Sequence, residues 1–103
     1  MHQFIRDNKK QIEDLCRLYN VSRLEVFGSA ARASDFDMTS SDADFLVEFF
    51  KPSKLPPLEE YIGFRDELKQ LLGRSVDLVE SRSIRNPYLR KSIDESRELV
   101  FAA

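Results

Sequence analysis

Two aspartates at the start of a hydrophobic segment are the residues of this sequence best suited to chemistry. Asp42 and Asp44 are separated by one residue and lead directly into the run FLV at 45–47, which is typical of a β-strand. Residues two apart on a strand project from the same face, so both carboxylates can converge on one hard cation, which prefers oxygen ligands. Like charges held together raise one another's pKa, and a bound divalent ion resolves that conflict. The spacing predicts a metal site, and two ions about 3.5–4 Å apart with a nucleotide between them suit phosphoryl or nucleotidyl transfer.

A glycine and a serine follow an earlier strand-like segment. Residues 23–27 are rich in strand-forming side chains and stop at Gly28, where glycine permits a tight turn and the close approach of a phosphate. Ser29 and the small residues after it are good helix-start residues, and such a helix would point its free N–H groups at a ligand over Gly28. The Ser29 hydroxyl could add one further phosphate contact. A Gly-Ser pair after a strand is common, so this interpretation depends on the aspartate pair thirteen residues later.

The loop between these segments holds a competing pair, Asp35 and Asp37. After Asp37 the sequence continues as MTSS, which has no strand character, so only the second pair is anchored to a strand. We therefore expect Asp35 and Asp37 to be solvated loop carboxylates.

A third acidic candidate lies further along the chain, because a site of this kind usually needs one. Asp77 alternates with Val76 and Leu78 in the short segment VDLVE and should face the opposite way from them. A carboxylate within so apolar a segment is expensive to bury unless it is paired or bound to a metal. We expect Asp77 to be the third ligand and a base for an attacking hydroxyl.

Hydrophobic periodicity predicts the elements that position these groups. Apolar residues at helical spacing indicate one amphipathic helix over residues 3–19, ended near Asn20, and another over residues 58–72, ended at Gly73. Between them, residues 51–57 hold three of the four prolines and should form an extended connection.

The C-terminal part is less clearly patterned. Asn86 followed by Pro87 fits the cap and first position of a helix. Residues 98–101 fit either a last short strand or a frayed end. A basic cluster lies in this part, and we favour a solvent-facing surface over contact with a triphosphate or a partner; its members are Arg82, Arg85, Arg90 and Lys91.

Bulk properties limit the range of functions. The 103 residues fit a single domain, 1–103, with one modest core and no second domain to grip a substrate. A formal charge of −2 gives no electrostatic reason to expect tight binding to nucleic acid. Cys16 is the only cysteine and should be a small core residue, and the single histidine, His2, has no identifiable partner for catalysis. The charged N-terminus and the lack of an apolar run of about 20 residues predict a cytoplasmic protein without a membrane segment.

The combination of motifs resembles a known family. Gly28-Ser29, twelve intervening residues, the Asp42-x-Asp44 pair before a hydrophobic strand, and the later Asp77 look like the signature of the DNA polymerase beta-type nucleotidyltransferase superfamily. The longer sequence pattern GSAAR…SDADFLVEF resembles that of the minimal nucleotidyltransferases in this superfamily, the MNT domains that act as antitoxins to HEPN toxins. The resemblance spans most of the chain, from Leu24 to Val79.

The resemblance implies an α/β (α+β) fold with a small mixed sheet flanked by helices. It also implies ATP and Mg²⁺ as cosubstrates, and transfer of AMP to a hydroxyl, in these antitoxins a tyrosine of the cognate HEPN ribonuclease. Carried over to this chain, Asp42 and Asp44 would hold two metal ions and Asp77 would be third ligand and base. Gly28 and Ser29 would hold the triphosphate, with Arg32 in a supporting or phosphate-binding role.

One position departs from the family pattern, because Ala33 stands where the family often has glycine after the arginine. No carboxylate is missing, so an intact active site is expected, with an obligate protein partner to supply acceptor specificity. Two alternatives are an antitoxin that neutralises its toxin by binding alone and, less favoured, a metal nuclease. A nuclease would not explain the Gly28-Ser29 turn.

Overall fold

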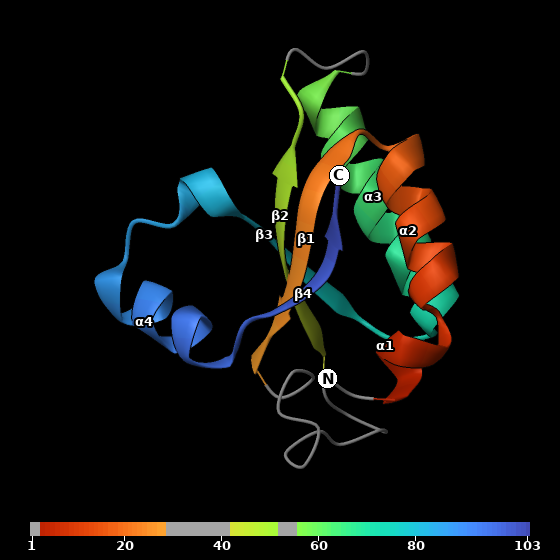
Figure 1. Cartoon of the computed structure of the whole chain (residues 1–103). Helices are drawn as coiled ribbons and strands as arrows, with labels where there is room; N and C mark the ends of the chain where they lie inside the picture. Colours follow the sequence, from red (N-terminus) through yellow and green to blue (C-terminus); the bar gives the residue numbers. More distant parts are fainter. Residues whose placement is uncertain (1–2, 29–41, 52–55) are drawn as a thin grey trace.

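The computed structural model describes residues 3–28, 42–51 and 56–103, which form a four-stranded mixed sheet with helices on both faces (Figure 1). The strand order is β3-β2-β1-β4, where β1 is antiparallel to β2 and β4, and β2 is parallel to β3. The expected mixed sheet flanked by helices is confirmed. In chain order the elements are α1 (Gln3–Asp7), α2 (Lys9–Leu18), β1 (Val21–Phe27), β2 (Ala43–Phe49), α3 (Pro57–Leu72), β3 (Val76–Glu80), the short 3₁₀ helix η3 (Ser81–Ser83), α4 (Pro87–Ser96) and β4 (Glu98–Ala102).

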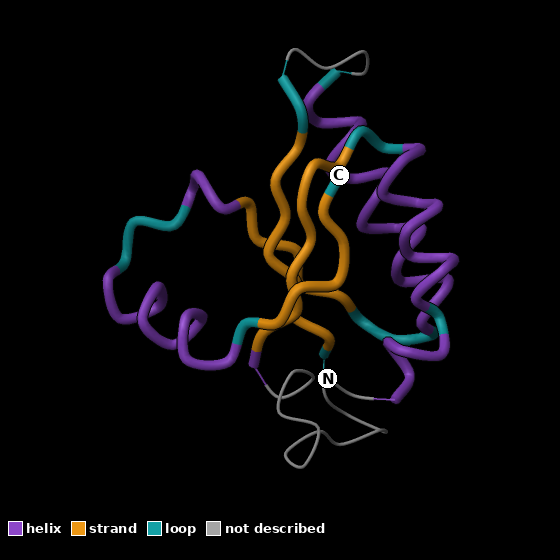
Figure 2. The backbone as a smooth tube through the Cα atoms, in the orientation of Figure 1, coloured by secondary structure: helices purple, strands orange, loops and turns teal. Residues whose placement is uncertain are grey.

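The sheet has one heavily packed face, on which α2 and α3 lie (Figure 2). Alternate residues of each strand point to this face, because successive side chains of a strand project to opposite sides. Cys16 is fully buried here, as expected, and burial raises the pKa of its thiol to about 12, so it is an inert core group. The fully buried side chains of this core include Ile5, Ile12, Leu24, Val26, Phe45, Val47, Phe64 and Leu68.

The opposite face of the sheet carries a much smaller core under α4. Phe27 of β1, Leu46 of β2 and Ile93 of α4 are buried together, with Val79 and Ile84 packed against them. Figure 1 shows α4 on the side of the sheet away from α2 and α3. Polar and charged groups can therefore occupy this face of the strands without entering the main core.

The N-terminal helical segment is two helices rather than the single helix predicted over residues 3–19. The break is at Asn8, whose side-chain amide donates to the carbonyl oxygen of Phe4 at 2.7 Å. That carbonyl would otherwise accept the backbone N–H of Asn8, which instead reaches the Ile5 oxygen at 3.3 Å. Asparagine competes with the helix backbone in this way, which apolar periodicity does not reveal.

The other predicted helices and strands that fall within the described residues agree with the structure. Gly73 ends α3 in a left-handed conformation (φ 66°), and its N–H donates to the Lys69 oxygen. Asn86 caps α4, accepting from the N–H of Tyr88 at 2.9 Å and of Leu89 at 3.4 Å. The segment left open at 98–101 is the strand β4, and β1 begins two residues earlier than predicted. The central part of the connection at 51–57 lies outside the described residues.

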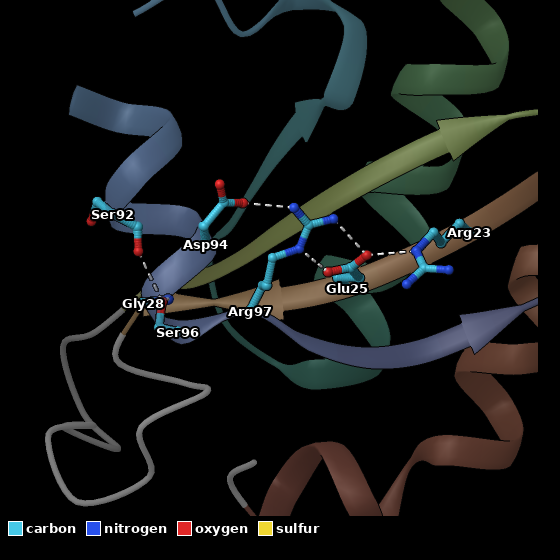
Figure 3. Close-up of polar contacts among 7 residues, drawn as sticks. All are labelled: Arg23, Glu25, Gly28, Ser92, Asp94, Ser96 and Arg97. Atoms are coloured by element: carbon cyan, nitrogen blue, oxygen red, sulfur yellow. Dashed lines mark hydrogen bonds and ion pairs between the residues drawn. The ribbon is translucent and has the colours of Figure 1, made fainter. Parts of the chain in front are cut away.

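A charge network ties the end of α4 to the sheet (Figure 3). Glu25 of β1 is only 3% exposed, and Arg97, which follows α4, donates to its two carboxylate oxygens at 2.5 and 2.9 Å. Arg23 contacts the same carboxylate, and Arg97 also pairs with Asp94. The hydrogen bond from Arg97, and then that from Arg23, lower the pKa of Glu25 from 4.5 to about 2 despite burial.

Replacing the main partner of this buried carboxylate should destabilise the protein. Arg97→Met should lower the free energy of unfolding at neutral pH by about 2–3 kcal/mol, because it leaves a buried charge underpaired. The pKa of Glu25 is lower in the folded than in the unfolded state, so the stabilisation is present above about pH 4.5 and is lost as the pH falls toward 2. The difference from wild type, measured by urea unfolding, should shrink over that range.

The control is an exposed pair on α2. Asp14→Asn removes an ion pair with Arg17 in which both side chains are 64% exposed, and it should change the stability by less than about 0.5 kcal/mol. A difference for Arg97→Met that stays constant between about pH 6 and about pH 3 would contradict the role given to Glu25.

Candidate active site

Two of the aspartates singled out in the sequence are brought side by side by the sheet. The register pairs Phe27 of β1 with Asp44 of β2, and Asp44 with Asp77 of β3. The end of one strand and the starts of two others therefore meet at one edge. Asp44 and Asp77 alternate with residues of the main core, so both side chains lie on the face that α4 partly covers.

Asp42 stands one residue before β2 and is exposed. Asp42 is two residues from Asp44, and the residue between them, Ala43, is extended as the first residue of β2. Residues two apart on an extended chain point to the same side, so the side chain of Asp42 is expected on the same face as that of Asp44. Its charge is close enough to contribute to the raised pKa of Asp44. The three carboxylates thus belong to one region, with Asp44 and Asp77 as the adjacent pair.

The electrostatics of the pair are unfavourable without a cation. The pKa of Asp44 is raised from 3.8 to about 6, first by burial, then by the charge of Asp77 and its hydrogen-bonding contact, and then by Asp42. A bound cation would remove this penalty, since it favours the charged form of every carboxylate around it.

The donor set fits magnesium. All three side chains offer oxygen only, which suits a hard cation. Within the described parts of the chain, no three acidic, histidine or cysteine side chains are grouped closely enough to enclose a metal ion unaided. Mg²⁺ commonly takes one or two carboxylates and completes its shell with water and substrate phosphates, so two adjacent aspartates and a nearby third are a suitable set.

Gly28 has a left-handed backbone conformation and lies close to Asp44, a combination that favours glycine. Its φ is 69°, and a Cβ built at this position would lie 2.8 Å from Oδ2 of Asp44. Its N–H donates to Oγ of Ser96 at 2.9 Å, and that hydroxyl reaches the Ser92 oxygen at 3.3 Å (Figure 3). The bare backbone of Gly28 therefore borders the Asp44 carboxylate, and Ser96 ties α4 to the backbone of Gly28.

Several predicted residues fall in parts of the chain that the structure does not describe. The residues outside the described parts are His2, Ser29, Arg32, Asp35 and Asp37. The helix expected to follow Gly28 lies there as well. Their roles stay as predicted from the sequence.

A cavity of about 430 Å³ opens beside the carboxylates. Two of its lining residues come from α3 and had no signal in the sequence. Tyr61 donates its hydroxyl to the Leu78 oxygen of β3, and Arg65 lies one helical turn further on. The lining residues are Phe27, Asp44, Tyr61, Arg65, Val76, Asp77, Leu78, Val79 and Leu89.

Arg65 is the cation among the described residues lining this cavity. Its side chain is partly exposed, and its contacts with Oδ1 of Asp66 are long, at 3.3 and 3.4 Å. The guanidinium is therefore available to an anionic ligand. An anion bound between Arg65 and a metal held by the aspartates would be neutralised from both sides. The arrangement suits a molecule that joins phosphates to an apolar or aromatic group.

Comparison with known proteins agrees with this chemistry. The chain is 38% identical, over 90% of its length and 87% of the other, to a Methanocaldococcus jannaschii protein with the provisional name protein adenylyltransferase MJ1379. It is 32% identical, over 86% of its length and 82% of the other, to protein adenylyltransferase MntA of Thermococcus cleftensis.

Solved structures share the fold. One described provisionally as a minimal nucleotidyltransferase superposes with a TM-score of 0.74 at 29% identity, covering 95% of both chains. Two others show likeness of fold alone. A toxin–antitoxin complex with AMP-PNP superposes with a TM-score of 0.68 at 21% identity, covering 93% of this chain and 74% of that one. A tri-AMPylated Shewanella oneidensis HEPN toxin in complex with MNT antitoxin gives a TM-score of 0.65 at 20% identity, covering 96% of this chain and 73% of that one.

The family assignment rests on a match over most of the chain. The sequence profile of the family described as Nucleotidyltransferase domain matches residues 8–100. The resemblance seen in the sequence motifs is thereby confirmed, and the chain belongs to the nucleotidyltransferase domain family.

Proposed function

We propose that this protein is a Mg²⁺-dependent protein adenylyltransferase that transfers AMP from ATP to a tyrosine hydroxyl of a HEPN-family toxin and so acts as its antitoxin. The observation that carries the proposal is the meeting of Asp44, Asp77 and the bare backbone of Gly28 beside one cavity. The proposal is supported by relatives named protein adenylyltransferases and by the AMPylated toxin seen with an antitoxin of the same fold.

Each site residue has a part in the proposed reaction. Asp42, Asp44 and Asp77 would hold two Mg²⁺ ions, which when bound supply positive charge to the phosphates. Gly28 lets the triphosphate approach the main chain, and Ser29 and Arg32 add contacts to it. Arg65 would hold the outer phosphates from the α3 side of the cavity.

The transfer itself needs one base and one leaving group. The acceptor oxygen forms a bond to the α-phosphorus while the bond to the β-phosphate bridging oxygen breaks, and pyrophosphate leaves. Asp77 is exposed and adjacent to Asp44, so its carboxylate can take the proton of the acceptor hydroxyl. AMP then remains on the acceptor.

The first test uses the aspartate pairs. The purified protein is incubated with Mg²⁺, α-labelled ATP and the protein encoded beside its gene, and the partner is followed by intact mass. Wild type should add one or more AMP units, and Asp42→Asn with Asp44→Asn should reduce transfer by roughly 10²–10³-fold, because charge stabilisation of the phosphates is lost.

The control is Asp35→Asn with Asp37→Asn, which changes the same number of charges and should leave transfer intact. No transfer by wild type, together with a stable complex that still inhibits the partner, would overturn the enzymatic proposal. The protein would then be an antitoxin that works by binding alone.

Gly28→Ala should remove activity through Asp44. The new Cβ would stand 2.8 Å from Oδ2 of Asp44, so the carboxylate must move, and transfer should fall by roughly 10²-fold. Gly73→Ala is the matched control, since it has nearly the same φ but nothing within 4 Å of the added Cβ. Both variants should lose about 1–2 kcal/mol of stability from the left-handed backbone, yet only Gly28→Ala should lose transfer. Equal activity of the two variants would refute the close approach of Gly28 to the reaction centre.

Arg65→Met should weaken ATP binding. Loss of a charged hydrogen bond to phosphate is expected to raise the KM for ATP about tenfold or more while kcat changes much less. Lys69→Met, one turn further along α3 and exposed, removes the same charge away from the cavity and should leave the KM unchanged. An unchanged KM for Arg65→Met would remove this residue from the site, and Arg65→Lys should restore part of the loss.

A further inference from the structure

A basic and apolar surface lies on α4 and the segment before it. We call it the α4 surface and define it as Arg82, Arg85, Tyr88, Leu89 and Lys91. Tyr88 is 83% exposed and Leu89 41% exposed, although large apolar side chains are usually buried. Arg82, Arg85 and Lys91 are exposed, and none of their side chains makes an ion pair or hydrogen bond with another described residue.

The charge of this surface contrasts with that of the whole chain. Residues 81–93 contain four cationic side chains and no carboxylate, in a protein whose formal net charge is −2. Three of the four cations belong to the α4 surface, and the fourth, Arg90, is half-buried and donates to the Ser81 oxygen. A separated cluster of this sign attracts and orients an acidic partner.

The surface is joined directly to the candidate active site. Leu89 lines the cavity together with Asp44 and Asp77, while its neighbour Tyr88 points to solvent. A molecule seated on Tyr88 and Leu89 would therefore reach the mouth of the cavity without crossing any other element.

The surface is also held in place. Asn86 caps the start of α4, Ile93 is fully buried against Phe27 and Leu46, and Ser96 and Arg97 bind the backbone of Gly28 and the carboxylate of Glu25 (Figure 3). A helix fixed at both ends offers a preformed binding surface, which lowers the entropic cost of association.

We propose that the α4 surface docks an acidic face of the protein that carries the acceptor hydroxyl, and thereby places that hydroxyl over the cavity. This inference rests on the proposed function and adds the surface that selects the acceptor. Exposed tyrosine and arginine beside an apolar side chain are the groups that contribute most at protein interfaces.

A nucleic acid fits this surface less well. Its phosphates would meet the carboxylates of Asp42, Asp44 and Asp77 next to the docking site, and the chain has no excess of positive charge to offset them. The acidic protein partner is therefore the occupant we propose, and RNA is tested against it.

The experiment reverses the charge of the surface. Arg82→Glu, Arg85→Glu and Lys91→Glu are combined, and the control combines Lys9→Glu, Lys10→Glu and Lys69→Glu, three exposed cations of α2 and α3. Both variants change the net charge equally. Binding of the protein encoded beside the gene is measured by calorimetry, AMP transfer by intact mass and ATP binding by thermal shift. Binding of a single-stranded RNA of about 16 nucleotides, long enough to fill a binding site on one small domain, is measured by fluorescence anisotropy.

The charge reversal should weaken partner binding at least tenfold and lower AMP transfer by the same factor, while ATP binding stays unchanged. The control variant should match wild type in partner binding and in AMP transfer. Tyr88→Ala should weaken binding about tenfold, and Tyr88→Phe should preserve it. If the charge reversal leaves partner binding unchanged, the proposal is overturned, whether or not AMP transfer occurs. If the reversal also abolishes RNA binding in that case, the surface binds RNA instead of the protein partner.

The two proposals can fail separately. Transfer by wild type that the reversal leaves intact refutes the docking surface and keeps the enzyme. Partner binding that the reversal abolishes, without transfer under any condition, keeps the docking surface and refutes the enzyme. A wild-type protein that neither binds nor modifies this partner overturns both.

Discussion

The mutual repulsion of the Asp44 and Asp77 carboxylates is the interaction on which the candidate active site at this end of the sheet depends. Parallel pairing of β2 and β3 places the two residues at the same register, and neither can move away without breaking the ladder. The crossover through α3 forces this parallel arrangement, and α3 is itself fixed by the core around Phe64 and Leu68. Packing far from the site thus imposes an unfavourable pair of charges at one edge, which a cation and a phosphate chain can relieve.

The two faces of the sheet divide stability from chemistry. The face under α2 and α3 holds the large apolar core, whereas the opposite face has only the small cluster around Ile93. With so little apolar area, α4 depends on polar ties: the Gly28–Ser96 hydrogen bond and the Glu25–Arg97 pair. Both ties end on β1 at or near the turn that borders Asp44, so the position of α4 and the shape of the site are set by the same contacts.

Much of this arrangement could be predicted from the sequence, because it depends on local signals. Asp77 was found from strand alternation, and Gly28 from its place after a strand. Ser96 and Arg65 could not be found, since a serine or arginine on a helix carries no sign of what it will face once the sheet forms. The continuous helix over residues 3–19 was predicted wrongly for a related reason: a single side-chain hydrogen bond at Asn8 outweighed a regular apolar period.

The size of the domain explains why acceptor choice would fall to α4. A chain of 103 residues has one main core and uses most of its helical surface to cover it. Of the α-helices among the described residues, α4 is the one on the face that carries Asp44 and Asp77, and its buried side, at Ile93, is narrow. The first two turns of that helix are therefore free to carry exposed side chains that the fold does not need, such as Tyr88, Leu89 and Lys91. The exposed carboxylates of α4, Asp94 and Glu95, lie in its last turn, where Asp94 pairs with Arg97. A surface that contributes little to folding, yet borders the cavity through Leu89, is where partner recognition can change without disturbing the carboxylates.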